Sequence, residues 1–282
     1  KTLGGSKKKI HCYASDIGLP MSDADIEAWY RQMAEEYGFR HAKLKVGLDQ
    51  DADLRRLEMM ERVFKERTDA PMLYVDANEY WSPKQAIRKV SEMEERCSIS
   101  WIEEPARRWD YLGLRRVKES VRTAVCAGEN LDTLGDFLPY FQHRAADVIQ
   151  VSYGMTGISC ALQIADAAFG YELPITLGGS PGLIHAHLAT VMPNFMTLEV
   201  PDPVVRDGIF TSDIEVVDGW VVVGDRLGLG LEINREALEQ KRVDVIPAGS
   251  GPSPFGRRPG AGLYEVLPTQ AERAEAAKGV LA

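Results

Sequence analysis

The apolar positions along this chain recur in short runs that alternate with longer amphipathic segments. The short runs are rich in β-branched and aromatic residues, whereas most of the segments between them carry apolar residues at helical spacing. Strands that alternate with helices form a parallel sheet, and eight such units suit a closed (β/α)₈ barrel. The predicted strands lie near residues 10–14, 42–46, 72–76, 99–103, 124–128, 146–151, 173–177 and 195–200.

The segments between the strands show why helices are expected there. The segment after the second strand carries an apolar stripe suited to packing on a sheet, formed by Leu54, Leu57, Met60 and Phe64. The next segment opens with Ser82, Pro83 and Gln85, the pattern of a helix capping box. Its inward positions are predicted to be Ile87, Val90 and Met93. Residues 156–169 are small and apolar, which predicts close packing against the barrel wall.

Three of the apolar runs change to a carboxylate at their carboxyl-terminal end. These residues are Asp76, Glu103 and Glu129, which are 27 and 26 residues apart, the length of one strand plus one helix. One such carboxylate is more often a cap or loop residue, but three in phase with a barrel repeat are predicted to meet at the active-site end of the barrel. One repeat earlier, Lys43 and Lys45 are two positions apart and therefore point to the same side of their strand. Three carboxylates suit a hard divalent cation, and we expect Mg²⁺ with two ammonium groups facing it.

Composition excludes several other classes of protein. The 282 residues are 45% apolar and carry a net charge of −9, which argues against binding nucleic acid or an anionic membrane. No apolar run approaches a membrane span and no signal peptide is visible, so a cytoplasmic protein is expected. The four cysteines lie far apart without a C-x-x-C pair, so reduced thiols and no zinc site are expected; they are Cys12, Cys97, Cys126 and Cys160.

The pattern changes after the eighth strand. Short strands joined by glycine-containing turns follow, and then a segment dense in proline and glycine. The chain begins with Lys1, and its first strand follows almost at once, so we expect that preceding sequence is missing. The predicted division is a catalytic barrel over residues 1–206, strands and a helix over 207–242, and a tail over 243–282.

Four motifs together resemble the mandelate racemase and muconate-lactonizing branch of the enolase superfamily. They read Lys43-Leu-Lys45, Val75-Asp76-Ala-Asn78, Trp101-Ile-Glu103-Glu104-Pro105 and Gly128-Glu129-Asn130. The resemblance runs from Leu3 to about residue 240. It implies a modified TIM barrel of seven to eight β/α units, whose C-terminal strands return toward an N-terminal α+β capping domain that is absent or truncated here. It also implies a homo-oligomer.

The resemblance assigns roles residue by residue. It implies that Asp76, Glu103 and Glu129 are the Mg²⁺ ligands and that Lys45 is the base that removes a proton next to a carboxylate. Lys43 is then the companion lysine, which lowers the pKa of the base and touches the substrate carboxylate.

Further residues receive supporting roles. Glu199, on the eighth strand, matches the acid that hydrogen-bonds the developing enolate. Asn78 and Glu104 are expected beside the ligands, and His187 is expected to be structural.

The chain departs from this family pattern where a second base is expected. The seventh strand, residues 173–180, has no histidine at its end, and the sixth strand offers Asp147 and Gln150 but no lysine. His185 lies several residues later on a predicted helix. A racemisation needs a proton donor on each face, so the pattern favours dehydration with Lys45 as base.

The expected substrate is therefore a small carboxylate, and the expected reaction is the dehydration of a sugar acid to a 2-keto-3-deoxy acid by a Mg²⁺-dependent hydro-lyase. A racemase, epimerase or cycloisomerase using the same first step is an alternative. A noncatalytic barrel that binds metal and carboxylate but has lost its second base is another.

Overall fold

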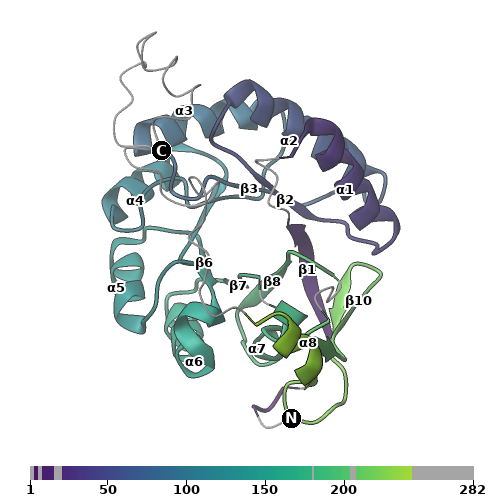
Figure 1. The fold of residues 1–282 in the computed structure, drawn as a ribbon. Helices are drawn as coiled ribbons and strands as arrows, with labels where there is room; N and C mark the ends of the chain where they lie inside the picture. The colour runs from purple at the N-terminus through teal and green to yellow at the C-terminus, as the bar shows by residue number, and fades with distance from the viewer. Residues whose placement is uncertain (1–2, 6–7, 16–20, 180, 204–207, 243–282) are drawn as a thin grey trace.

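Eight parallel strands close into a barrel that helices surround on the outside (Figure 1). The computed structural model describes residues 3–5, 8–15, 21–179, 181–203 and 208–242. The barrel strands are β1 (Lys9–Ser15), β2 (Ala42–Lys45), β3 (Leu73–Asp76), β4 (Trp101–Glu103), β5 (Ala124–Ala127), β6 (Val148–Val151), β7 (Ile175–Leu177) and β8 (Phe195–Val200). The predicted α/β barrel is confirmed, and each observed strand overlaps a predicted one.

The helices follow the strands in the order that the alternation predicts. Helices α1 to α6 form an outer ring, and a short 3₁₀ turn and α7 separate β7 from β8. Their bounds are α1 (Asp23–Glu35), α2 (Gln50–Lys65), α3 (Pro83–Glu94), α4 (Tyr111–Ser120), α5 (Leu134–His143), α6 (Tyr153–Gly170), η1 (Pro181–Leu183) and α7 (Ala186–Ala189).

Strand β1 closes the barrel and also joins it to the C-terminal elements. Residues 12–14 pair in parallel with 198–200 of β8, and residues 14–15 pair with the start of β2. Residues 9–11 pair antiparallel with β11 (Trp220–Val222), which pairs in turn with β10 (Glu215–Val217).

The remaining C-terminal elements stand apart from this sheet. A separate antiparallel pair, β9 (Phe210–Ser212) and β12 (Leu231–Ile233), precedes α8 (Arg235–Gln240). The predicted short strands after residue 207 are therefore observed, and the predicted tail over 243–282 lies outside the described residues.

The outer helices bury the stripes that the sequence predicts. All four apolar residues of the α2 stripe are buried, and so are Val90 and Met93 of α3, whereas Ile87 is half-buried. Ser82 and Gln85 form the predicted capping box. Helix α6 differs in part from the prediction, because Phe169 is 58% exposed and only one face of the helix packs on the barrel.

Aromatic rings fill the barrel interior beneath the predicted site. Tyr13, Tyr74 and Trp101 are fully buried, and the rings of Tyr74 and Trp101 stack with their centroids 3.8 Å apart. Tyr74 and Trp101 each lie two residues before a predicted ligand, Asp76 or Glu103, so they face the same interior one layer deeper. The barrel is thus a packed core that leaves its polar layer at one end.

Two expectations from composition concern the cysteines and the membrane. All four cysteines are free thiols, and three of them are buried. None of the described helices is long and apolar enough to cross a membrane.

Candidate metal centre and lysine pair

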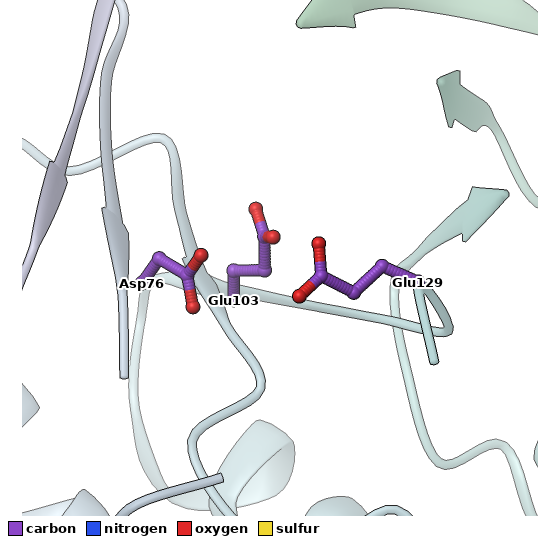
Figure 2. Close-up of side chains that lie close together, drawn as sticks. All are labelled: Asp76, Glu103 and Glu129. Carbon is purple, nitrogen blue, oxygen red and sulfur yellow. The ribbon is translucent and has the colours of Figure 1, made fainter. Parts of the chain in front are cut away.

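Three carboxylates from consecutive strands converge at the carboxyl-terminal end of the barrel. Asp76 and Glu103 are the last residues of β3 and β4 and pair directly in the parallel register, while Glu129 lies two residues beyond β5. One oxygen from each lies within 4.8 Å of the others. Figure 2 shows the three side chains pointing toward a common centre. The structure therefore brings together the three residues that the spacing singled out.

Gly128 lets the chain leave β5 so that Glu129 reaches this centre. Its φ is +130°, a region that side chains rarely adopt, and a Cβ there would lie 2.5 Å from the backbone oxygen of Gln150. The glycine of the Gly-Glu-Asn motif is thus required by a close approach to β6.

Lys43 and Lys45 extend from β2 toward the same three carboxylates. The Lys43 ammonium, which is fully buried, donates to Glu103 at 2.8 and 2.9 Å and lies 3.3 Å from Asp76. Lys45 pairs with Asp76. On the outer side of β2, the Tyr30 hydroxyl of α1 donates to the Lys43 carbonyl at 2.9 Å, which fixes the strand to its helix. The two lysines therefore share one face, as their spacing predicts.

Glu199 of β8 completes the polar layer on the other side of Lys43. One of its oxygens lies 2.8 Å from the Lys43 ammonium and accepts from the Ser15 hydroxyl at 2.5 Å. The other accepts from the backbone N–H of Gly179 at 2.8 Å. Burial alone would raise the pKa of Glu199, but Lys43 and Lys45 outweigh it and hold that pKa at about 2. Glu199 is therefore ionised and oriented toward Lys43.

The pKa values of the acidic cluster reflect crowded buried charge. Burial and the neighbouring carboxylates raise the pKa values of Glu103, Glu104 and Glu129. Burial also acts on Asp76, but the two lysines outweigh it and lower its pKa to about 2. Burial alone would lower the pKa of Lys45, yet attraction to Asp76 raises it. The family resemblance implies a lowered pKa for Lys45. That lowering would require a cation to neutralise Asp76 in place of Lys45.

The donor set fits a hard divalent cation. Buried like charges are unfavourable unless something neutralises them, and oxygen ligands at this spacing are those that Mg²⁺ prefers. A further oxygen, Oδ1 of Asn78, is buried without a hydrogen-bond partner among the described residues. Asp76, Glu103 and Glu129 would hold the ion.

Asn78 and Glu104 lie where the sequence analysis expected them, beside the ligands. The Asn78 backbone N–H donates to Asp76 at 2.8 Å, and its side-chain amide donates to Glu129 at 3.2 Å. Glu104 accepts from the Asn130 amide at 2.9 and 3.0 Å. The two Asn78 contacts orient carboxylates that the cation would bind.

Sequence reasoning missed several residues that support the site. Two of them donate hydrogen bonds directly to the buried carboxylates, Ser15 to Glu199 and Asn130 to Glu104. The other two act through Asn130, because Arg108 donates to the Asn130 carbonyl and also binds Glu79. Asn130 could have been predicted from the sequence, because it follows Glu129 in the Gly-Glu-Asn motif. The other three carry no signal in periodicity or spacing.

The wall opposite the lysines is formed by the ends of β6 and β7. A Cβ at Gly178 would lie 3.6 Å from Nε2 of Gln150 and 3.8 Å from both Ser152 and Glu199, so these residues line one corner of the site. Gln150 is fully buried, and its Nε2 has no partner among the described residues.

The remaining residues considered on these strands have structural contacts. Asp147 binds Lys118 and the Val125 N–H at the opposite end of β6. His185 is buried and bonds to the Glu199 backbone carbonyl at 3.1 Å, and burial lowers its pKa to about 4. His187 contacts the carbonyl of Leu229 at 3.1 Å, in keeping with the structural role expected for it.

The structure is thus a parallel α/β barrel with three converging carboxylates, which could hold a metal ion, and two lysines at its carboxyl-terminal end. Residues 25–237 match the family described as "Enolase C-terminal domain-like". The chain belongs to this family, in which it resembles mandelate racemase and muconate-lactonizing proteins.

Known relatives include enzymes of more than one reaction type. An arabinonate dehydratase from Saccharolobus solfataricus is 31% identical over 85% of this chain, and an L-Ala-D/L-Glu epimerase from Clostridium acetobutylicum is 29% identical over 82%. An enolase from Bradyrhizobium, solved with magnesium and mandelic acid, is 30% identical over 86% of this chain, with a TM-score of 0.74. The chain spans about 65% of the length of each of these three proteins.

Proposed function

We propose that this protein catalyses the Mg²⁺-dependent removal of a proton next to a carboxylate and dehydrates a sugar acid to a 2-keto-3-deoxy acid. The observation that carries the proposal is the buried Lys43–Lys45 pair facing three converging carboxylates. A protein that only binds an anion gains little from burying two ammonium groups beside a metal centre, since burying charge is costly. The arabinonate dehydratase relative and the magnesium-containing enolase support it.

Each residue of the pair has a separate task in this reaction. When bound, Mg²⁺ acts as a Lewis acid that stabilises negative charge on the substrate carboxylate. Lys45, at the mouth of the layer, accepts the α-proton at Nζ. Lys43, held between Glu103 and Glu199, places its positive charge where the enediolate forms. Glu199 is assigned to stabilising the same enediolate through Lys43 and the Ser15 hydroxyl, which it holds in place, because an ionised carboxylate has no proton to donate to an oxyanion.

Dehydration is favoured over racemisation by the wall opposite Lys45. Strand β6 lies across the closed eight-stranded barrel from β2. Gln150, Ser152 and Gly178 lie together at the ends of β6 and β7, and none of them carries a group that titrates near neutral pH. Proton transfer on one face suffices for dehydration, because the α-proton that Lys45 accepts can be passed to the departing hydroxide, which leaves as water, whereas racemisation needs a proton donor on each face.

The proposal also covers how the chain is divided into a catalytic unit and a C-terminal segment. We place the catalytic unit in residues 1–206 and assign 207–242 to a return toward a capping domain, which the pairing of β11 with β1 supports. The same proposal includes a small carboxylate as the substrate and a homo-oligomer as the assembly of the complete protein.

Incubation with Mg²⁺ in D₂O against a panel of sugar acids and other α-hydroxy acids tests the proposal, with α-proton exchange and 2-keto acid formation followed together by NMR. Exchange with keto acid is expected, and Lys45→Ala should abolish both while Mg²⁺ still binds. Exchange without keto acid would instead indicate an epimerase, as in the Clostridium relative. If no acid of the panel exchanges and Lys45→Ala binds ligands as the wild type does, the noncatalytic alternative is favoured.

A further inference from the structure

Three loops follow the strands that lead to the predicted metal ligands, and one arginine in the second loop contacts the other two. Arg108 belongs to the loop between β4 and α4. Its guanidinium binds the Glu79 carboxylate in the loop after β3, with Nη2 at 3.2 Å from Oε2. Its Nη1 donates to the Asn130 carbonyl, in the loop after β5, at 2.8 Å. Asp76 and Glu103 end the strands that precede the first two loops, and Glu129 lies in the third loop.

Hydrogen bonds continue from this arginine to the ligand layer. The Asn130 amide donates to both Glu104 oxygens and to Glu129 at 3.3 Å. The Glu79 backbone N–H donates to the Glu104 carbonyl at 2.8 Å. We call Glu79, Arg108 and Asn130 the loop brace.

The backbone around the loop brace adopts conformations that need support. Asn78, Glu79 and Glu104 have φ values of 42°, 62° and 41°, in the left-handed region that glycine adopts most readily. Such residues persist where surrounding contacts determine them, and they cluster at functional sites. Glutamates rather than glycines stand at two of these positions, and the Glu79 side chain is 1% exposed and bound to Arg108.

We infer that the loop brace is a positioning device that holds the three ligand carboxylates at the separation a divalent cation requires. The inference rests on the proposed metal site. Arg108 is suited to this because a planar guanidinium can bind a carboxylate and a carbonyl at once in fixed geometry, whereas an ammonium is a point charge. Groups that orient metal ligands in this way typically change metal affinity by roughly 10- to 100-fold when they are replaced.

The sign of the effect separates positioning from simple electrostatics. If Arg108 acted only as a positive charge, Arg108→Gln would strengthen cation binding and Arg108→Lys would leave it unchanged. If it positions the ligands, both variants weaken binding. Glu79→Gln, which keeps the chain length and can still accept a hydrogen bond from Arg108, should have a smaller effect than either.

The test is Mg²⁺ titration of the metal-free proteins by calorimetry, together with the EPR line shape of bound Mn²⁺. We expect an affinity at least roughly tenfold lower in Arg108→Lys and Arg108→Gln, and a changed Mn²⁺ spectrum. Arg40→Lys is the matched control, because Arg40 makes a comparable two-pronged pair with Asp218 at the other end of the barrel. It should bind Mg²⁺ as the wild type does.

Thermal melts in EDTA show whether each variant is folded before titration. Affinity within twofold of the wild type in folded Arg108→Lys, or tighter binding by Arg108→Gln, would overturn the positioning role while leaving the metal site intact. Lower melting temperatures with unchanged Mg²⁺ affinity would also overturn it. A wild type that binds no Mg²⁺ would refute the metal site itself, and the role of the loop brace with it.

Discussion

Replacing Lys43 by methionine removes the buried positive charge on which the acidic layer depends. In the structure its ammonium lies 2.8 Å from Glu103, 2.8 Å from Glu199 and 3.3 Å from Asp76. Asp76 keeps Lys45, and Glu199 keeps the donors Ser15 and Gly179. Both oxygens of the Glu103 carboxylate accept hydrogen bonds from Lys43. The variant therefore deprives one fully buried carboxylate of the ammonium group that hydrogen-bonds it.

The expected loss in the free energy of unfolding follows from the Glu103 carboxylate, which loses its ion pair with Lys43. Removing one partner of a buried ion pair costs about 3–5 kcal/mol, and we take the lower end, about 3 kcal/mol, because two of the three carboxylates keep other partners. For a domain of this size that corresponds to a fall in Tm of roughly 6–12 °C.

The assay is urea unfolding followed by circular dichroism at pH 7 in EDTA. Lys118→Met is the matched control, because Lys118 pairs with Asp147 at 3.0 Å in a partly exposed position. Its loss should cost no more than about 1 kcal/mol. A free energy of unfolding for Lys43→Met within about 0.5 kcal/mol of the wild type would refute the claim that this lysine neutralises the layer.

Two further predictions concern other parts of the barrel. Burial and the nearby His11 lower the pKa of His41 to about 4, so its ring is neutral when folded and takes up a proton more readily when unfolded. The resulting stability is complete above about pH 6.5 and is lost as pH falls through 4; for this partly exposed ring we expect about 1–2 kcal/mol. His41→Asn keeps an acceptor for the Met72 N–H, and its unfolding free energy should fall less between pH 7 and 4.5; parallel pH curves would contradict this. Gly128→Ala should lower the free energy of unfolding by more than about 2 kcal/mol and weaken Mg²⁺ binding, because a Cβ would meet the Gln150 carbonyl. A variant whose urea unfolding and Mg²⁺ titration match those of the wild type would show this account to be wrong.

The strands and helices could be predicted from the sequence because each depends on local pattern. Apolar periodicity located all eight strands, and the Ser82 capping box fixed the start of α3. Some predicted strands were too long: residues 99–103 were predicted, whereas the observed strand is Trp101–Glu103. A strand begins and ends where a neighbour offers hydrogen-bond partners, and that depends on the stagger of the closed barrel rather than on the residue itself.

The sequence by itself determined which strand ends bring acidic and basic side chains together in this protein. Side chains alternate along a strand and parallel strands end at one rim, so spacing alone was enough to bring Asp76, Glu103 and Glu129 together. The same rule placed Lys43 and Lys45 on one face.

Only the tertiary structure decided how these charges are paired and held. The contact between Ser15 and Glu199 exists because β1 closes the barrel onto β8, and the loop brace exists because three loops distant in sequence lie side by side. No periodicity links loop residues 29 and 22 positions apart, as Glu79, Arg108 and Asn130 are. Their partners are set by where the folded backbone brings them, and buried charge leaves few alternatives once they meet.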